Sequence, residues 1–326
     1  RDLEDPHVIR EMADTVPDPE LLRMLYVLTY CDTRAVGPTA WTDWKAVLLA
    51  DLYHKTALAL EGKNPIKPFD EAQRARVAAR IRDAYPEKID PAEVDQFLNN
   101  VPRKYLTSVP PARIARHMHL LRQLTPENQI VWEVTEPEHY NYTEITAISY
   151  DVRGFLSWMC AALSSKDINI LSLQAYSTKD GYAIDTFQVT DLRGNRLPHG
   201  FRLDRLRSDL NLVIQGKAKP EEMFLVRRRP RPPRTDLQLI KPNQIIFNND
   251  SSPDYTILEV KAFDRPGLLY DITSTCTAQG YFIHLAMITT EAYRVVDVFY
   301  ITDLENNKLE PPRIKRLEAA LNKVVE

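Results

Sequence analysis

An internal duplication constrains the fold of this chain more than any other feature. Residues 182–192 (YAIDTFQVTDL) are mirrored by residues 294–304 (RVVDVFYITDL), and Asp151 upstream is mirrored by Asp264. The offset is 112 positions in the first pair and 113 in the second. Self-similarity at a nearly constant spacing is typical of a repeated structural unit. The second half of the chain therefore predicts two copies of one small fold.

A strand–turn–helix segment opens each copy. An apolar, β-prone run precedes the turn, and apolar residues at helical spacing follow it. Glycine in such a turn adopts backbone conformations that a β-carbon opposes, and the first N–H groups of the helix are left unpaired. This geometry binds carboxylates and other small anions. We predict a ligand-binding site at each turn, made of Asp151, Arg153, Gly154, Phe155, Asp264, Arg265, Pro266, Gly267 and Leu268.

Each copy reads β-α-β-β-α, which predicts a ferredoxin-like sheet with both helices on one face. In the first copy the predicted elements are strand 143–150, helix 155–165, strands 168–177 and 182–190, and helix 202–215. A short strand at 244–249 follows and is available as a final strand of the first copy, whereas the second copy ends at helix 311–325 without one. Because exposed edges invite pairing, we expect the copies to pair side by side, with residues 244–249 or a partner chain covering the remaining edge.

The first half of the chain is predicted to be helical. Asp18 and Pro19 open a helix with a capping side chain and a proline in the first turn. Trp41 and Trp44 open the next helix, which extends through Leu60. The whole chain is therefore of the α+β class, and its expected divisions are residues 1–65, a helical connector 66–140, a first copy 141–250 and a second copy 251–326.

One carboxylate in the helical part requires an explanation. Asp32 follows Leu28 by four residues, so it projects from the apolar side of its helix and either binds a metal or is solvated near the helix end, where it can cap the turn at Gly37. His117 and His119 are two residues apart and face different directions on a helix. They are predicted to be structural or surface residues, not metal ligands.

Composition excludes several classes of function. The 326 residues carry a net charge of −3, which gives no reason to expect nucleic acid or an anionic membrane as partner. Three scattered cysteines have no metal-ligand spacing and indicate a reducing, cytoplasmic environment. The arginine- and proline-rich run 227–234 is either an extended linker or a docking site for an acidic partner. The chain opens without methionine, and we expect it to be a fragment.

The repeated unit resembles the ACT domain, a module that binds amino acids between copies. The resemblance rests on the Asp-x-x-Gly turn in a βαββαβ order, and it is closer at Asp264–Leu269 than at Asp151–Leu156, which lacks the proline. The helical segment from Leu28 to Gly37, with Trp41 and Trp44, is similar to the end of the HD domain in the bifunctional PII uridylyltransferase/uridylyl-removing enzymes. In that family a nucleotidyltransferase domain and an HD domain precede two ACT domains.

The resemblance implies a function for the whole family and sets a limit for this chain. It implies glutamine sensing by the ACT pair, PII protein as the substrate of the intact enzyme, and Mg or Mn in an HD site to which Asp32 contributes. None of the seven histidines is followed by aspartate, so the His-Asp doublet of HD hydrolases is missing, and we expect the chain alone to be inactive. The alternative is a stand-alone amino-acid-binding regulatory module. The ligand itself is not readable from residue spacing.

Overall fold

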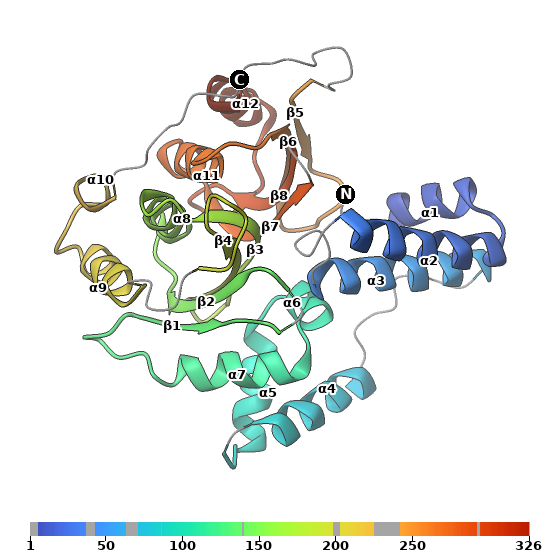
Figure 1. Ribbon diagram of the computed structural model, residues 1–326, viewed down its shortest axis with the longest axis horizontal. Coiled ribbons are helices and arrows are strands. Elements are labelled where there is room, and N and C mark those ends of the chain that lie inside the picture. Colours follow the sequence, from blue (N-terminus) through green and yellow to red (C-terminus); the bar gives the residue numbers. More distant parts are fainter. Residues whose placement is uncertain are drawn as a thin grey trace. The chain divides into compact units, whose positions relative to one another are not determined.

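The chain divides into two compact units in the computed structural model. The structure describes residues 6–36, 43–62, 71–85, 87–138, 140–197, 203–224, 242–291 and 294–325. One unit comprises Arg1–His119 with Glu138–Tyr140, and the other comprises Leu120–Pro137 with Asn141–Glu326. The first is built from helices and the second from a sheet and its helices (Figure 1). The predicted glycine turn at Gly37, Trp41 and the run 227–234 lie outside the described residues.

The helical unit follows the expected pattern closely. The helices that begin in it are α1 (Pro6–Thr15), α2 (Pro19–Val36), α3 (Asp43–Leu60), α4 (Glu71–Ala84), α5 (Pro91–Asn100), α6 (Arg103–Ser108) and α7 (Pro111–Leu121). Helix α2 begins as its sequence predicts, because the Asp18 carboxylate accepts a hydrogen bond from the Glu20 N–H at 2.8 Å. Helices α1 and α2 both pack against α3, and α4 packs against α5.

Helix α2 departs from the expectation that its apolar residues all face a core. Leu22 is buried at 3% exposure, whereas Leu21, Met24 and Leu28 are 49–65% exposed. Asp32 lies one turn beyond Leu28 and is also exposed. The apolar spacing therefore predicted the helix correctly but not which of its sides is buried.

The second unit is built on an antiparallel sheet. Its strands are β1 (Ile130–Thr135), β2 (Thr143–Tyr150), β3 (Asn169–Ser177), β4 (Tyr182–Thr190), β5 (Gln244–Asn248), β6 (Thr256–Phe263), β7 (Phe282–Glu291) and β8 (Arg294–Thr302). In the described part of the chain they form one eight-stranded sheet in the order β1-β2-β4-β3-β7-β8-β6-β5. Strands β1, β2, β4 and β3 of the first repeat correspond to β5, β6, β8 and β7 of the second, so the order from either edge to the centre is the same. This symmetry is expected from the duplication.

The two repeats join through their central strands. Strands β3 and β7 pair antiparallel, with Ser172 opposite Thr289 and Tyr176 opposite Leu285. The expectation that the copies pair side by side is confirmed. Because the pairing lies within one chain, the two repeats share a single hydrogen-bonded sheet.

The outer strands correct one detail of the predicted topology. We expected the strand near Gln244 to be available as a fourth strand of the first repeat, but β5 pairs with β6 of the second, Gln244 opposite Lys261 and Asn248 opposite Ile257. Strand β1 has the matching place beside β2. Each repeat is thus preceded, not followed, by the strand that covers its edge. The expectation that this segment covers the open edge of the second repeat is confirmed.

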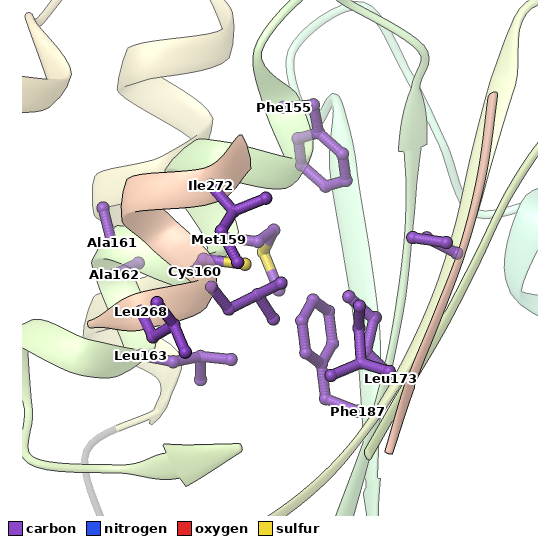
Figure 2. Packing of buried hydrophobic residues seen from close by; sticks show 14 of the residues in the cluster. Phe155, Met159, Cys160, Ala161, Ala162, Leu163, Leu173, Phe187, Leu268 and Ile272 are labelled. Carbon is purple, nitrogen blue, oxygen red and sulfur yellow. The ribbon is translucent and has the colours of Figure 1, made fainter. Parts of the chain in front are cut away.

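Helices cover one face of the sheet (Figure 1). The helices of this unit are α8 (Phe155–Ser165), α9 (Leu203–Ile214), the short α10 (Pro220–Met223), α11 (Leu268–Ala278) and α12 (Pro311–Val325). Helices α8 and α11 pack against each other, with α9 beside α8 and α12 beside α11. Figure 2 shows Met159 and Ile272 from these two central helices gathered near Phe187 of the sheet. One core therefore runs through both repeats.

Candidate functional site

Both predicted turns are present and have the same backbone geometry. Gly154 precedes α8 with φ 92°, and Gly267 precedes α11 with φ 81°, so both are in the left-handed region that glycine tolerates. No side chain caps either helix at these positions.

The first turn of α8 leaves backbone donors available. The Phe155 N–H donates to the Val152 carbonyl at 3.0 Å, and the Trp158 N–H donates to the Gly154 carbonyl at 3.0 Å. Among the described residues, no backbone acceptor outside the helix is present for Leu156. A helix N-terminus with exposed N–H groups and its dipole favours a negatively charged group.

Gly154 also lies at a close contact between the repeats. A β-carbon at this position would lie 3.2 Å from Trp158 Nε1 and 3.4 Å from Thr277 Cγ2. Thr277 belongs to α11 of the second repeat, so the first turn is packed against the end of the other repeat's helix. Glycine is required here by conformation and by space.

Each turn opens onto a pocket that both repeats line. The first-turn pocket, with an open volume of about 430 Å³, is formed by the turn Asp151–Leu156, residues of β3 and β4, and the end of α11 with the start of β7. The second-turn pocket, of about 410 Å³, is formed by the turn Asp264–Leu269, residues of β7 and β8, and the end of α8 with the start of β3. The sequence-predicted site residues fall into these two pockets.

The pockets occupy equivalent places in the duplicated fold. Thr277 in the first-turn pocket corresponds to Ser164 in the second, and Tyr281 corresponds to Ile168. On the sheet, Ala175 and Ala183 in the first-turn pocket correspond to Ile288 and Val295 in the second-turn pocket. The floor of the first-turn pocket is therefore lined by smaller side chains.

A buried carboxyl lies at the floor of each pocket. Asp185 of β4 is 2% exposed and Asp297 of β8 is 1% exposed. Within the described part of the chain, Oδ2 of Asp185 and both carboxyl oxygens of Asp297 have no hydrogen-bond partner. Sequence reasoning did not identify these two residues as site residues, although each recurs in the repeat and alternates with apolar residues on the buried side of its strand.

Burial keeps these carboxyls from ionising easily. It raises the pKa of Asp185 well above its ordinary value, and the nearby charge of Asp151 raises that pKa further. The pKa of Asp297 is raised in the same way, first by burial and then by Asp264. Each pocket thus holds one turn carboxyl and one sheet carboxyl close enough to interact.

The turn carboxyls are less buried than those on the sheet. Burial raises the pKa of Asp151, and a hydrogen bond with Ser177 opposes that rise. Burial also raises the pKa of Asp264, against the opposing effects of the Arg265 backbone N–H and the Arg265 charge. Both are accessible enough to meet a ligand at the pocket mouth.

The two predicted arginines have different roles. Arg153 Nη2 donates a hydrogen bond to the Thr277 carbonyl at 2.5 Å, which ties the first turn to the second repeat. Arg265 Nη2 pairs with Asp271 Oδ2 at 2.6 Å and donates to the Val324 carbonyl at 2.7 Å. Arg265 is therefore held within its own repeat.

A histidine also lines the first-turn pocket. His284 Nε2 lies 2.8 Å from Thr302 Oγ1, and burial lowers the pKa of His284 to about 4. The imidazole is neutral near pH 7, so it contributes hydrogen bonding and shape and does not supply a positive charge to the pocket.

Curated proteins are similar to this chain over nearly its whole length. Bifunctional uridylyltransferase/uridylyl-removing enzymes from Cereibacter sphaeroides, Gluconobacter oxydans and Azospirillum brasilense are 33%, 32% and 31% identical to it over 327 aligned residues, which cover 98–100% of this chain. The chain spans about a third of their length, 34–35%. The matching third is the C-terminal one. This chain is a homologue of the C-terminal part of bifunctional uridylyltransferase/uridylyl-removing enzymes.

Other comparisons add little to this relationship. The chain matches no family model. An aspartate kinase from Synechocystis is similar at 13% identity over 57% of this chain and 27% of the kinase, with a TM-score of 0.31, which is too low to support an argument. The ACT-like arrangement of this uridylyltransferase/uridylyl-removing enzyme homologue is therefore established by its own sheet order and by its paired repeats.

The metal-binding role predicted for Asp32 stays a prediction for the longer uridylyltransferase/uridylyl-removing enzyme. Asp32 is exposed near the end of α2. Among the described residues, no group of three or more His, Cys, Asp or Glu side chains is arranged to hold a metal ion. None of the described helices has the length and apolar character needed to cross a membrane.

His117 of this homologue has a structural environment. It is 2% exposed, and its Nδ1 lies 2.7 Å from the Tyr105 hydroxyl. Burial, with a smaller contribution from the charge of Arg113, lowers the pKa of His117 to about 3. The prediction that this residue has a structural role agrees with its burial on α7 against Tyr105 of α6.

Proposed function

We propose that this chain is the amino-acid-sensing regulatory region of a bifunctional uridylyltransferase/uridylyl-removing enzyme, and that glutamine binds in the turn pockets. The observation that supports this most strongly is the presence, in one pocket, of a helix N-terminus and of the buried carboxyl of Asp185, whose Oδ2 has no hydrogen-bond partner among the described residues. A free amino acid carries a carboxylate and an ammonium group close together. The two ends of the pocket match those two charges.

Each part of the ligand has a binding group in the first-turn pocket. The ligand carboxylate lies at the first turn of α8, where backbone N–H groups and the helix dipole stabilise a negative charge. The ligand ammonium lies beside the Asp151 carboxylate. The second-turn pocket offers α11 and Asp264 in the same places.

The choice of glutamine as the ligand, and the role of the site in an intact enzyme, rest on the resemblance to the enzyme family. In the intact cytoplasmic enzyme, glutamine in the ACT pair selects between uridylylation and deuridylylation of the PII protein, and Mg or Mn serves the catalytic domains. We propose that the 326-residue chain alone performs neither reaction, because both kinds of phosphoryl chemistry need metal-held ligands and only Asp32 of those ligands is present. This sequence contains neither the His-Asp doublet of HD hydrolases nor the Gly-Ser and Asp-x-Asp signature of nucleotidyltransferases. Release of UMP from modified PII by the purified chain would contradict this.

A stand-alone amino-acid-binding module is the alternative function. The alignment with the uridylyltransferase/uridylyl-removing enzymes covers the helical unit as well as the repeats, since it extends over 98–100% of the chain. This extent favours the regulatory region of the enzyme. The two functions share the same ligand site.

Calorimetric titration of the purified chain with each of the twenty amino acids tests the proposal. We expect heat with glutamine, and a loss of affinity in the variants Asp151→Ala and Asp264→Ala. Asp254→Ala, at an exposed position outside both pockets, serves as the control and keeps the affinity. Absence of heat with every amino acid would rule out the proposed function. A loss of stability without a loss of affinity would show that the turn carboxyls only support the fold.

A further inference from the structure

The sheet carboxyls Asp185 and Asp297 occupy positions where an aspartate is costly. Asp185 lies between Ala147 and Ala175 on the neighbouring strands, on the side of the sheet that faces the helices. Asp297 lies between Val260 and Ile288 in the second repeat. Burying an ionised carboxylate without a partner costs several kcal/mol, so each group must hold a proton or meet a cation.

The charged groups around Asp185 do not supply that cation. The guanidinium of Arg153 is bonded to the Thr277 carbonyl, and His284 is neutral near pH 7. Cys160 of α8 lies near both sheet carboxyls, and burial raises the pKa of its thiol well above the ordinary value, so the thiol is uncharged. Tyr281, which also lines this pocket, has a pKa raised chiefly by burial and is uncharged too.

The charged groups around Asp297 do not supply a cation to its carboxyl either. Arg265 lines the second-turn pocket but is paired with Asp271 at 2.6 Å, and Asp264 adds a further negative charge. Among the described residues, each pocket therefore contains two interacting carboxyls and no cationic side chain committed to them.

We propose that Asp185 and Asp297 are the inner binding groups for the ligand's ammonium, and that each gives up a proton to solvent when the ammonium enters. This inference rests on the proposed function. The carboxyl of Asp185 loses its proton to the buffer, and the resulting carboxylate forms an ion pair with the ligand ammonium. The turn carboxylate of Asp151 remains ionised at the outer side of the same ammonium. Asp297 and Asp264 act identically in the second-turn pocket.

Two consequences follow for recognition. A ligand without a protonated amine cannot replace the lost proton by a positive charge, so the pockets reject it even when the carboxylate and side chain are unchanged. Binding becomes tighter as pH rises while the sheet carboxyl is still protonated in the free chain. For release of one proton per ligand, the affinity increases about tenfold per pH unit.

Calorimetry in two buffers tests this directly. Glutamine is titrated into the full chain at one pH in phosphate and in Tris, whose ionisation heats differ, so that the difference in heat counts the protons released. We expect about one proton per glutamine bound. 4-Carbamoylbutanoate, which is glutamine without its amino group, should produce no binding heat.

Matched variants identify the source of the proton. Asp185→Asn and Asp297→Asn keep the side-chain shape and remove the titrating group, so the double variant should bind glutamine at least tenfold more weakly and without proton release. Asp204→Asn, at an exposed position on α9, should behave like the unmodified chain. If the double variant does not fold, the proton count of the unmodified chain still decides.

The outcomes separate this inference from the proposed function. Glutamine binding without proton release, or with undiminished affinity in the double variant, would overturn the role of Asp185 and Asp297 and leave the amino-acid site standing. No binding of any amino acid would overturn both.

Discussion

Arg153 of the first repeat donates a hydrogen bond across the repeat boundary to the carbonyl oxygen of Thr277, with 2.5 Å between Nη2 and O. Thr277 lies in the last turn of α11, where the negative end of the helix dipole favours a cation, and its carbonyl also accepts the Gly280 N–H at 3.1 Å. The same threonine lines the first-turn pocket. The turn that precedes α8 in the first repeat is thus hydrogen-bonded to the C-terminal end of α11 in the second repeat.

The variant Arg153→Ala removes this connection. Because Arg153 is exposed, we expect a small loss of stability, at most about 1 kcal/mol, together with faster hydrogen exchange around Thr277 and the first turn. Arg193→Ala, at an exposed arginine of the loop after β4, is the control and leaves the exchange at Thr277 unchanged. Equal exchange in both variants would show that the bond does not hold the repeats together.

Gly154→Ala tests the requirement for glycine at the first turn. The left-handed conformation costs an alanine about 1–2 kcal/mol, and the contacts with Trp158 and Thr277 add to that cost. Gly194→Ala is matched to it, since Gly194 has φ 80° but no atom within 4 Å of an added β-carbon. Chemical unfolding should show a larger loss for Gly154→Ala. Equal losses would mean that the close contact between the repeats contributes nothing.

The sequence predicted most of this architecture because its signals are local. Strands β2 and β4 and helices α8 and α12 have the predicted bounds, since each combines a clear period with a turn or a cap at its end. The short helix α6 was missed, because six residues are too few to establish a period. Of the two places expected for β5, the one beside the second repeat is confirmed and the one in the first repeat was wrong, because strand pairing depends on long-range contacts that chain order does not encode.

The turn residues of the site were predicted and the sheet residues were not, because only the turns have a local signal in the sequence. The turn residues were found through the glycine and the repeat. Asp185 and Asp297 were visible as a recurring pair but were not identified as site residues, because their importance depends on burial and on the absence of a partner among the described residues. The contribution of Thr277 and Tyr281 to the first-turn pocket requires the pairing of β3 with β7, which only the folded chain shows.

The sheet carboxyls also predict how stability depends on pH. Folding raises the pKa of Asp185 and Asp297, so the folded chain keeps protons that the unfolded chain releases above about pH 4. The protonated Asp185 and Asp297 carboxyls contribute fully to the free energy of unfolding below that pH. This contribution is lost as pH rises toward the pKa that the two carboxyls have in the folded chain. The slope is up to about 1.4 kcal/mol per pH unit for each residue.

Denaturant unfolding across pH measures this contribution. The variant that combines Asp185→Asn and Asp297→Asn should lose less stability than the unmodified chain between pH 5 and pH 8, roughly, because neither asparagine titrates. Parallel curves for the two proteins would show that the carboxyls are not protonated in the folded state.

His117 predicts the opposite dependence in the helical unit. Its folded pKa of about 3 lies below the ordinary value, so the unfolded chain takes up a proton first and acid destabilises this unit. The contribution is present above about pH 6.5 and is lost as pH falls, which amounts to about 2 kcal/mol between pH 7 and pH 5.

The variant His117→Gln isolates this effect, since glutamine can still bond the Tyr105 hydroxyl but does not titrate between those pH values. Hydrogen exchange in α7 should be much less sensitive to acid in the variant. An unchanged sensitivity would place the titrating group elsewhere.

Hydrogen exchange of the whole chain with and without glutamine tests the central claim, that an amino acid binds where the two repeats meet. We predict slower exchange at both turns, Asp151–Leu156 and Asp264–Leu269, and along β3 and β7, because each pocket contains residues of both repeats. Slower exchange at one turn alone, with β3 and β7 unchanged, or no change anywhere at saturating glutamine, would contradict it.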